Sequence, residues 1–385
     1  MQDVIIVGGG VIGLSLAYEL AGQGVAVTVV DQGPLGQEAS WAGAGMLPPG
    51  NPECRLSPEA SLRGGSHVLW PGLSAALLAE TGIDNGFRRC GGLEVVADGF
   101  RSHLHAEVNA LRAEGVTAEL QECEQLLRYE PALNPRLAGG YYLPEMGQVR
   151  NPRHLKALMA GCAARGVALV PGTPVDQFDR LHEKIISVRT PQGRLHAGQF
   201  VLTAGAWTSR LLCEVNCPAE IRPMRGQMVL LSAQPALLKH VVNVGSRYIV
   251  PRGDGRILVG STEEVAGFDK RNTAGGVGGL LEFARQIVPE LERANFERAW
   301  AGLRPQSADG LPYLGRIAET ENLFVAAGHF RAGLQLSPIT AKVVSQLLLG
   351  REPSVPLEAF APDRLRRQSL AGTPTWSAPE VQSIA

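Results

Sequence analysis

The chain has 385 residues, of which 45% are hydrophobic and 19% charged, with 36 basic and 37 acidic side chains. This length exceeds one typical core and predicts two domains. A formal net charge of −1 excludes a global field that would recruit nucleic acid or an anionic membrane. The six cysteines lack C-x-x-C spacing, which predicts free thiols and no metal site. With no basic leader and no apolar run of about 20 residues, we expect a cytoplasmic protein.

The first 31 residues predict a dinucleotide-binding unit. The apolar run 4–7 is typical of a buried parallel strand, and residues 14–21 and 25–30 follow as a helix and a second buried strand. Between strand and helix stands G-x-G-x-x-G, whose backbone can approach a pyrophosphate at a helix N-terminus. We expect the cofactor to meet five residues of this motif: Gly8, Gly10, Val11, Ile12 and Gly13. Asp31 ends the second strand, close to the spacing of about 20 residues at which an acid accepts the ribose hydroxyls.

Two later segments are rich in small residues. Residues 38–47 combine Ala, Ser and Gly, so that either a large flat ligand or a neighbouring domain could lie against their backbone. Residues 200–208 read as a buried strand that breaks at Gly205, a second strand–glycine–helix junction of the kind that approaches the same ligand.

The remaining elements predict two domains that are interleaved in sequence. We expect helices around a short strand in residues 56–112, a helix at 152–165, and alternating antiparallel strands from 221 to about 300. A buried strand at 322–328 and a helix at 337–349 follow. The predicted domains are an α/β dinucleotide-binding domain (1–80, 150–218 and 300–367), an antiparallel-sheet substrate domain (81–149 and 219–299) and a loosely ordered tail (368–385).

A series of motifs recurs in the order that one known family has them. After the glycine motif come E-A-S (38–40) with G-A-G-M-L (43–47), T-A-G-A-W (203–207), P-M-R-G-Q (223–227), Y-I-V-P-R (248–252), W-A-G-L-R-P (300–305), D-G-L-P (309–312) and G-H-F-R-A-G (328–333). Together they closely resemble the D-amino-acid oxidase superfamily of FAD-dependent amine oxidoreductases, and within it the glycine oxidase branch (ThiO). The likeness covers residues 1 to about 364.

This resemblance implies an activity and a cofactor. It implies non-covalent FAD, and an oxidase that converts glycine, O2 and water to glyoxylate, ammonia and H2O2, supplying the imine for thiamine thiazole synthesis. The family accepts an amine that is already deprotonated, so no catalytic base is expected. Small amines and O2 are then the partners, and the sequence leaves a homo-oligomer open.

The resemblance also assigns residues. Arg304 matches the anchor of the substrate carboxylate, Tyr248 the tyrosine whose hydroxyl assists it, and Arg331 a residue beside substrate and flavin. Alternatives are a surface turn for Arg304 and an ordinary core position for Tyr248. The further cofactor contacts that it implies are Ser40, Ala44, Gly45, Met46, Val175, Gly205, Trp207, His329, Arg331, Gly333 and Leu334. The helix that begins near Gly333 would direct its N–H groups at the flavin, where negative charge collects on reduction.

Two departures leave the substrate open. Ser246 stands where the best-known branch members carry histidine, and Glu263 where they carry methionine. Alternatives are therefore a sarcosine or D-amino-acid oxidase, an oxidase of N-substituted glycines, or a dehydrogenase that passes electrons to the respiratory chain. A non-catalytic dinucleotide-binding module is a further alternative, against which the co-occurrence of the two arginines and Tyr248 speaks.

Overall fold

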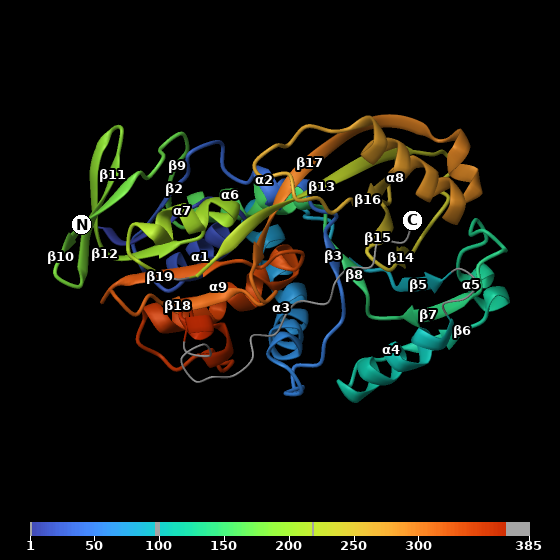
Figure 1. Cartoon of the computed structure of the whole chain (residues 1–385), viewed down its shortest axis with the longest axis horizontal. Helices are drawn as coiled ribbons and strands as arrows, with labels where there is room; N and C mark the ends of the chain where they lie inside the picture. Colours follow the sequence, from blue (N-terminus) through green and yellow to red (C-terminus); the bar gives the residue numbers. More distant parts are fainter. Residues whose placement is uncertain (1, 97–100, 218, 367–385) are drawn as a thin grey trace. The chain divides into compact units, whose positions relative to one another are not determined.

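The computed structural model of the chain describes residues 2–96, 101–217 and 219–366, so the predicted tail lies outside the described residues (Figure 1). The mixed α/β fold expected from the sequence is confirmed: one sheet is built mainly of parallel strands and another mainly of antiparallel strands. Within the described ranges, no helix is long and apolar enough to cross a membrane.

The chain divides into two compact units. Unit 1 is formed by Met1–Ser40, Leu155–Pro223 and Arg304–Ala385, and unit 2 by Trp41–His154 and Met224–Leu303. The sequence placed residues 41–80 with the dinucleotide-binding domain, whereas the structure groups them with unit 2. The physical reason is that Ala44 is buried in a core cluster of unit 2 and that Arg252 and Trp300 bind the backbone of this segment.

Unit 1 is built on an eight-stranded sheet with the order β10-β11-β12-β1-β2-β9, extended by β19 and β18 beside β12. Its strands are β1 (Gln2–Val7), β2 (Val27–Val30), β9 (Ala168–Val170), β10 (Gln177–Leu181), β11 (Lys184–Thr190), β12 (Gly193–Leu202), β18 (Tyr313–Arg316) and β19 (Leu323–Ala327). The central strands β19, β12, β1, β2 and β9 run parallel. β-Branched and other apolar side chains fill these strands because both faces of a parallel sheet are covered.

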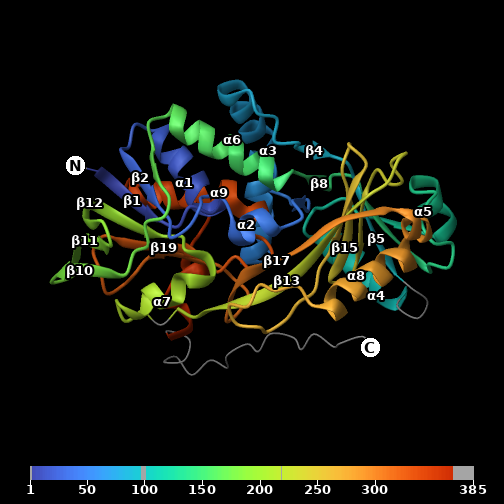
Figure 2. The same ribbon diagram turned by 90° about the horizontal axis from the view of Figure 1, so that it is seen from above.

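The helices of unit 1 cover this sheet. They are α1 (Val11–Ala21), α7 (Thr208–Cys213), α9 (Gly333–Leu348), the 3₁₀ turns η1 (Gly205–Trp207) and η3 (Glu358–Phe360), and most of α6 (Asn151–Ala164). Helices α1 and α9 lie side by side against the parallel strands (Figure 2). Because α1 is buried along almost its whole length, its residues are apolar on nearly every side.

Unit 2 contains a second eight-stranded sheet with the order β17-β13-β16-β15-β14-β5-β7-β6 and a small sheet β3-β8-β4. The strands are β3 (Met46–Leu47), β4 (Arg88–Arg89), β5 (Gly92–Val96), β6 (Glu119–Gln121), β7 (Gly139–Leu143), β8 (Gly147–Gln148), β13 (Ile221–Ser232), β14 (Val241–Val244), β15 (Arg247–Pro251), β16 (Arg256–Gly260) and β17 (Asn295–Ser307). The short helix α2 (Glu38–Ala42), β13 and β17 run across the boundary between the units.

Side chains of this sheet alternate between two cores. One face packs against α5 (Cys123–Tyr129), α8 (Ala274–Ile287) and η2 (Pro289–Arg293), and the other against α4 (Arg101–Ala113). Helix α3 (Pro58–Thr81) begins at Ser57, whose hydroxyl accepts the N–H of Ala60, and ends at Gly82 in the left-handed conformation. The face that carries Tyr248 is the one that bears α4.

Helix α8 corrects the expectation that residues 221–300 contain only strands and turns. Four glycines dilute its apolar pattern, and glycine is a poor helix former. The helix forms because the hydroxyl of Thr273 caps it, accepting the N–H of Gly276 at 3.1 Å, and because Leu280, Phe283 and Ile287 bury one face. Tertiary packing thus overrides the local preference.

Candidate functional site

The glycine motif forms the turn between β1 and α1, and two of its glycines are required by the chain itself. A Cβ on Gly13 would overlap the carbonyl oxygen of Gly8, and a Cβ on Gly8 would overlap the backbone of Thr203. Gly8 has a φ of +117°, which L side chains rarely adopt. The hydroxyl of Thr203, the residue that follows β12, donates to the carbonyl of Gly8 at 2.7 Å and holds the turn from the side of that strand. The motif pattern alone does not predict this role for Thr203.

Asp31 holds the other side of this turn. One carboxylate oxygen accepts the N–H of Gly9 at 2.7 Å and the other accepts the N–H of Gly33 at 2.8 Å. Burial raises the pKa of Asp31, and the two backbone hydrogen bonds oppose that shift. The predicted ribose-binding acid therefore also fixes the backbone of the glycine motif.

The start of α1 is arranged to receive an anionic group. Ser40 accepts the N–H of Val11 at 2.9 Å, and the Cβ position of Gly10 lies 3.0 Å from the same hydroxyl. The absence of a side chain at Gly10 therefore leaves the helix N-terminus open beside a hydroxyl donor. Exposed N–H groups at a helix N-terminus are the usual partners of a pyrophosphate, so these residues fit the dinucleotide that the sequence predicts.

Further predicted cofactor contacts of unit 1 lie at the ends of its parallel strands. Gly205 begins η1 directly after β12 with a φ of +54°, and no atom lies within 4 Å of the position where its Cβ would stand. Trp207 ends the same turn and is half-buried. Val175 is half-buried and packs against the core of unit 1. The open space at Gly205 is what a ligand approaching the backbone needs.

Arg304 and Arg331 belong to paired segments of unit 1. Phe330 donates its N–H to the carbonyl of Pro305 at 2.9 Å, and Gln306 forms a β-bridge with His329. Phe330 has a φ of +48°, a strained conformation for an aromatic residue. The exposed guanidinium of Arg331 lies 5.3 Å from the Phe330 ring centroid, and Arg304 is half-buried. Pairing of the two segments thus brings together the predicted carboxylate anchor and the predicted flavin-side arginine.

His329 and the start of α9 complete this part of unit 1. The His329 ring is buried and its Nε2 lies 3.0 Å from the hydroxyl of Thr340. Burial lowers the pKa of His329 to about 3, so the ring is neutral at physiological pH. A Cβ on Gly333 would make only an ordinary contact at 3.5 Å, so the chain's own packing does not require this glycine. Leu334 follows in the first turn of α9 and is half-buried.

The remaining predicted cofactor contacts, Ala44, Gly45 and Met46, lie in unit 2. A Cβ on Gly45 would overlap the carbonyl oxygen of Val149, and its φ is +74°. Met46 pairs with Gln148 between β3 and β8. These contacts hold the backbone of residues 44–46 in one conformation.

The side chains of Trp300 and Arg252 also hold residues 42–46, although the sequence analysis assigned neither residue to a site. Trp300 donates its indole N–H to the carbonyl of Ala42 at 3.0 Å. The buried Arg252 donates to the carbonyl of Ala44 at 2.6 Å, and its other bonds go to Gln148 at 2.6 Å and Val149 at 3.1 Å. Both residues belong to motifs that carry the family resemblance. Their partners are distant in sequence, so no local pattern predicts these contacts.

Tyr248 lies on the α4-bearing face of the large sheet of unit 2. It pairs with Gly260 on β16, and Gly260 pairs with Met228 on β13. A Cβ on Gly260 would come within 2.7 Å of the Tyr248 ring, so this glycine makes room for it. The half-buried Tyr248 donates its hydroxyl to the Met228 sulfur at 3.3 Å, a weak bond that a better acceptor can replace. Of the predicted catalytic residues, Tyr248 belongs to unit 2, and Arg304 and Arg331 to unit 1.

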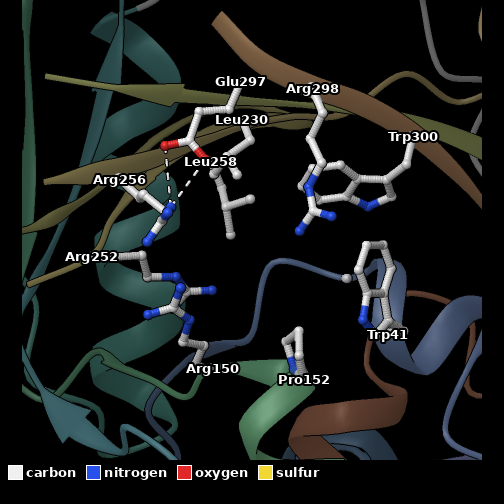
Figure 3. A pocket seen from close by; sticks show the side chains of 11 residues that line it. Trp41, Arg150, Pro152, Leu230, Arg252, Arg256, Leu258, Glu297, Arg298 and Trp300 are labelled. Carbon is white, nitrogen blue, oxygen red and sulfur yellow. Dashed lines mark hydrogen bonds and ion pairs between the residues drawn. The ribbon is translucent and has the colours of Figure 1, made fainter. Parts of the chain in front are cut away.

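A cavity of about 450 Å³ opens on this face of unit 2 (Figure 3). Its lining residues are Trp41, Gly43, Arg150, Pro152, Leu230, Arg252, Arg256, Leu258, Glu297, Arg298 and Trp300. Figure 3 shows the side chains of Arg150, Arg252 and Arg256 on one side and Arg298 beside the two tryptophans on the other. The Arg298 guanidinium lies 5.1 Å from the ring centroid of Trp41 and 5.3 Å from that of Trp300.

The two departures from the family pattern also lie in unit 2. Ser246 is exposed in the turn between β14 and β15. Glu263 follows β16 and is half-buried, next to Glu264, which forms an ion pair with Arg225. Neither residue lines the cavity.

Comparison with known proteins gives matches along nearly the whole chain. A family model described as FAD dependent oxidoreductase (DAO) matches residues 3–347. Glycine oxidase from Pseudomonas putida is 37% identical over 368 residues, which are 94% of this chain and 98% of that protein. The crystal structure of glycine oxidase from Geobacillus kaustophilus has a TM-score of 0.89 at 36% identity, covering 93% of this chain and 97% of that one. The bifunctional protein ThiO/ThiG of Trichormus variabilis is 33% identical over 96% of this chain and 56% of its own length.

Proposed function

The chain belongs to the FAD-dependent oxidoreductase (DAO) family, as its motifs predict, and we propose that it oxidises glycine and other small amino acids. The products are glyoxylate, ammonia and H2O2. The observation that carries this proposal is the match to glycine oxidases over more than nine tenths of both chains, in sequence and in structure. The match to a ThiO/ThiG protein supports the further proposal that the imine serves thiazole synthesis for thiamine.

The residues of unit 1 fit FAD. The helix N-terminus beside Gly10 and Ser40 receives the pyrophosphate and Asp31 the ribose, and the uncrowded Gly205 and Gly333 leave space for the ring system. The flavin, when bound, accepts the two electrons that the substrate's Cα–H bond gives up. We propose that it is held non-covalently, since residues 304–314 contain no cysteine for a thioether bond.

The protein's own part is to bind and orient the amino acid. Arg304 holds the carboxylate with two parallel charge-assisted hydrogen bonds, and Tyr248 turns its hydroxyl from the Met228 sulfur to a carboxylate oxygen. Arg331 adds positive charge beside the same group. The amine enters deprotonated, so these residues need only fix the distance and the angle of the α-carbon.

The test is steady-state oxidation of glycine by the purified holoenzyme in air. Glycine should give glyoxylate and H2O2 in equal amounts, and sarcosine and D-alanine should react with lower or comparable kcat/KM, because one methylene changes binding by only ~1–3 kcal/mol. Glyoxylate without H2O2, formed only with an artificial electron acceptor, would favour the dehydrogenase alternative. A flavoprotein inert toward all three amino acids would contradict the proposal.

A further inference from the structure

The cavity of unit 2 carries more positive charge than glycine can use. Four guanidinium groups and one carboxylate, Glu297, line it. Asp254, just outside the lining, forms ion pairs with Arg150 at 2.7 Å and Arg256 at 3.0 Å, and Glu297 forms one with Arg256 at 3.0 Å. The four arginines and the two acids, Asp254 and Glu297, together leave a net charge of +2 at the cavity. Glycine brings a single carboxylate, which is already assigned to Arg304 and Tyr248.

Two of the four arginines interact with neutral groups. The hydrogen bonds of Arg252 go to two backbone carbonyls and the side-chain oxygen of Gln148. Burial lowers the pKa of Arg252 to about 10, and the neighbouring Arg150 and Arg88 add to the shift. Arg298 lies between two indole rings, where a guanidinium keeps its donors available. An anion in the cavity would offset this accumulated charge.

The cavity and Tyr248 share one face of one sheet. Tyr248, Val250 and Arg252 alternate along β15, and Gly260, Leu258 and Arg256 alternate beside them on β16. Tyr248 packs on the same apolar cluster as the cavity residues Leu230, Leu258 and Trp300. Since a strand rises about 3.4 Å per residue, the arginine row lies on the order of 14 Å from Tyr248 along the backbone. The long arginine side chains reduce that span to about 10 Å.

We propose that this arginine cavity of unit 2 binds a second carboxylate of the substrate, carried on an apolar chain about 10 Å from the carboxylate that Tyr248 binds. The proposal rests on the proposed function and extends its substrate class to N-carboxyalkyl glycines. The indole rings and Leu230 and Leu258 line the methylene chain, and Arg298, Arg252 and Arg256 receive the distal anion. Oxidation balances: the secondary amine gives two electrons and two protons to O2, forming H2O2, and water cleaves the imine to glyoxylate and a primary ω-amino acid.

The test compares N-(carboxypentyl)glycine with N-hexylglycine, its uncharged analogue of similar length. The wild-type holoenzyme should prefer the carboxylate in kcat/KM by tenfold or more. Arg298→Gln should reduce that preference at least fivefold, whereas Arg271→Gln should preserve it, because Arg271 is exposed and paired with Asp269 outside the cavity. A wild-type enzyme without preference, or an equal loss in both variants, would overturn the proposal.

A binding measurement separates this proposal from the proposed function. Azelate, which has the same carboxylate-to-carboxylate chain length as N-(carboxypentyl)glycine and cannot be oxidised, should bind the holoenzyme saturably in calorimetry. Arg298→Gln should weaken that binding at least fivefold, and nonanoate should bind more weakly than azelate. If azelate binds in this way while glycine is not oxidised, the cavity proposal stands and the proposed function fails. If glycine is oxidised and azelate binds no better than nonanoate, the cavity proposal fails alone.

Discussion

The two units prepare their sites in different ways. Around the glycine motif of unit 1 the predicted contacts depend on backbone: glycines without room for a Cβ, a helix N-terminus, and a carboxylate that holds two N–H groups. In unit 2 they depend on side chains that meet across strands, such as Tyr248 over Gly260, or the arginine row beside two indole rings. A site built from backbone groups can be predicted from the local spacing of residues in the sequence. A site built from side chains depends on the register of strands that are distant in sequence. Variants at the two kinds of site should therefore separate effects on the cofactor from effects on the substrate.

The largest effect should come from Arg304. Replacing it by alanine leaves the substrate carboxylate unpaired in a partly dry site, which costs roughly 2–5 kcal/mol in kcat/KM. Because the anchor also sets the distance of the α-carbon, kcat should fall as well. Arg304→Lys should recover only part of the loss, since it keeps the charge without the planar fork. Flavin content of both variants, measured by absorbance, should match the parent; loss of flavin would assign the residue to the cofactor instead.

Asp31→Ala should act on the cofactor alone. Two backbone N–H groups and the ribose lose a charged acceptor, so FAD affinity should fall by roughly 1.5–3 kcal/mol, measured by flavin fluorescence on reconstituted apoprotein. With saturating FAD, the ratio of kcat/KM for glycine and sarcosine should stay as in the parent. A changed ratio would mean that Asp31 also affects the choice of substrate.

Acid should destabilise both units through one buried histidine in each. The pKa values of His329 and His154 are lowered by burial to about 3, and Asn85 donates to the neutral ring of His154 at 3.2 Å. The unfolded chain binds protons near pH 6.5, so the free energy of unfolding is highest above that pH and falls as pH drops toward 3. At pH 5 each histidine should account for about 2 kcal/mol of lost stability.

Urea unfolding at pH 7 and pH 5 measures this loss. His154→Phe, which keeps a ring beside Trp70, should lose less stability between the two pH values than the parent. His329→Asn should do the same through unit 1. Parallel pH curves for parent and variants would mean that the two rings remain accessible to protons in the folded protein.

The smallest effect should come from Arg252→Lys. The ammonium group keeps the charge but cannot serve Ala44, Gln148 and Val149 together, which should cost about 1–3 kcal/mol. The melting temperature should fall, and cleavage of residues 42–46 by a protease should accelerate. Arg271→Lys is the matched control, because its exposed ion pair with Asp269 contributes little. Equal behaviour of the two variants would show that Arg252 does not hold residues 42–46 in place.

Much of unit 1 could be predicted from the sequence, because strand, glycine motif, helix and acid follow one another within 31 residues. Helix α8 could not, since its four glycines hide a stability that comes from packing. Nor could the place of residues 41–80, which depends on contacts such as Arg252 with Ala44, 208 positions apart in sequence. The cavity shows the same limit: its four arginines come from strands and loops that only the folded sheet brings together.

The most direct test of the central claim is anaerobic addition of glycine to the purified yellow protein, with the flavin spectrum recorded. Glycine should bleach the absorbance near 450 nm, and admitted air should restore it with release of H2O2. Arg304→Ala with the same flavin content should bleach at least tenfold more slowly at equal glycine concentration. If the parent flavin stays oxidised at saturating glycine, or if Arg304→Ala bleaches at the parent rate, the assignment of this chain as an oxidase of glycine anchored by Arg304 is wrong.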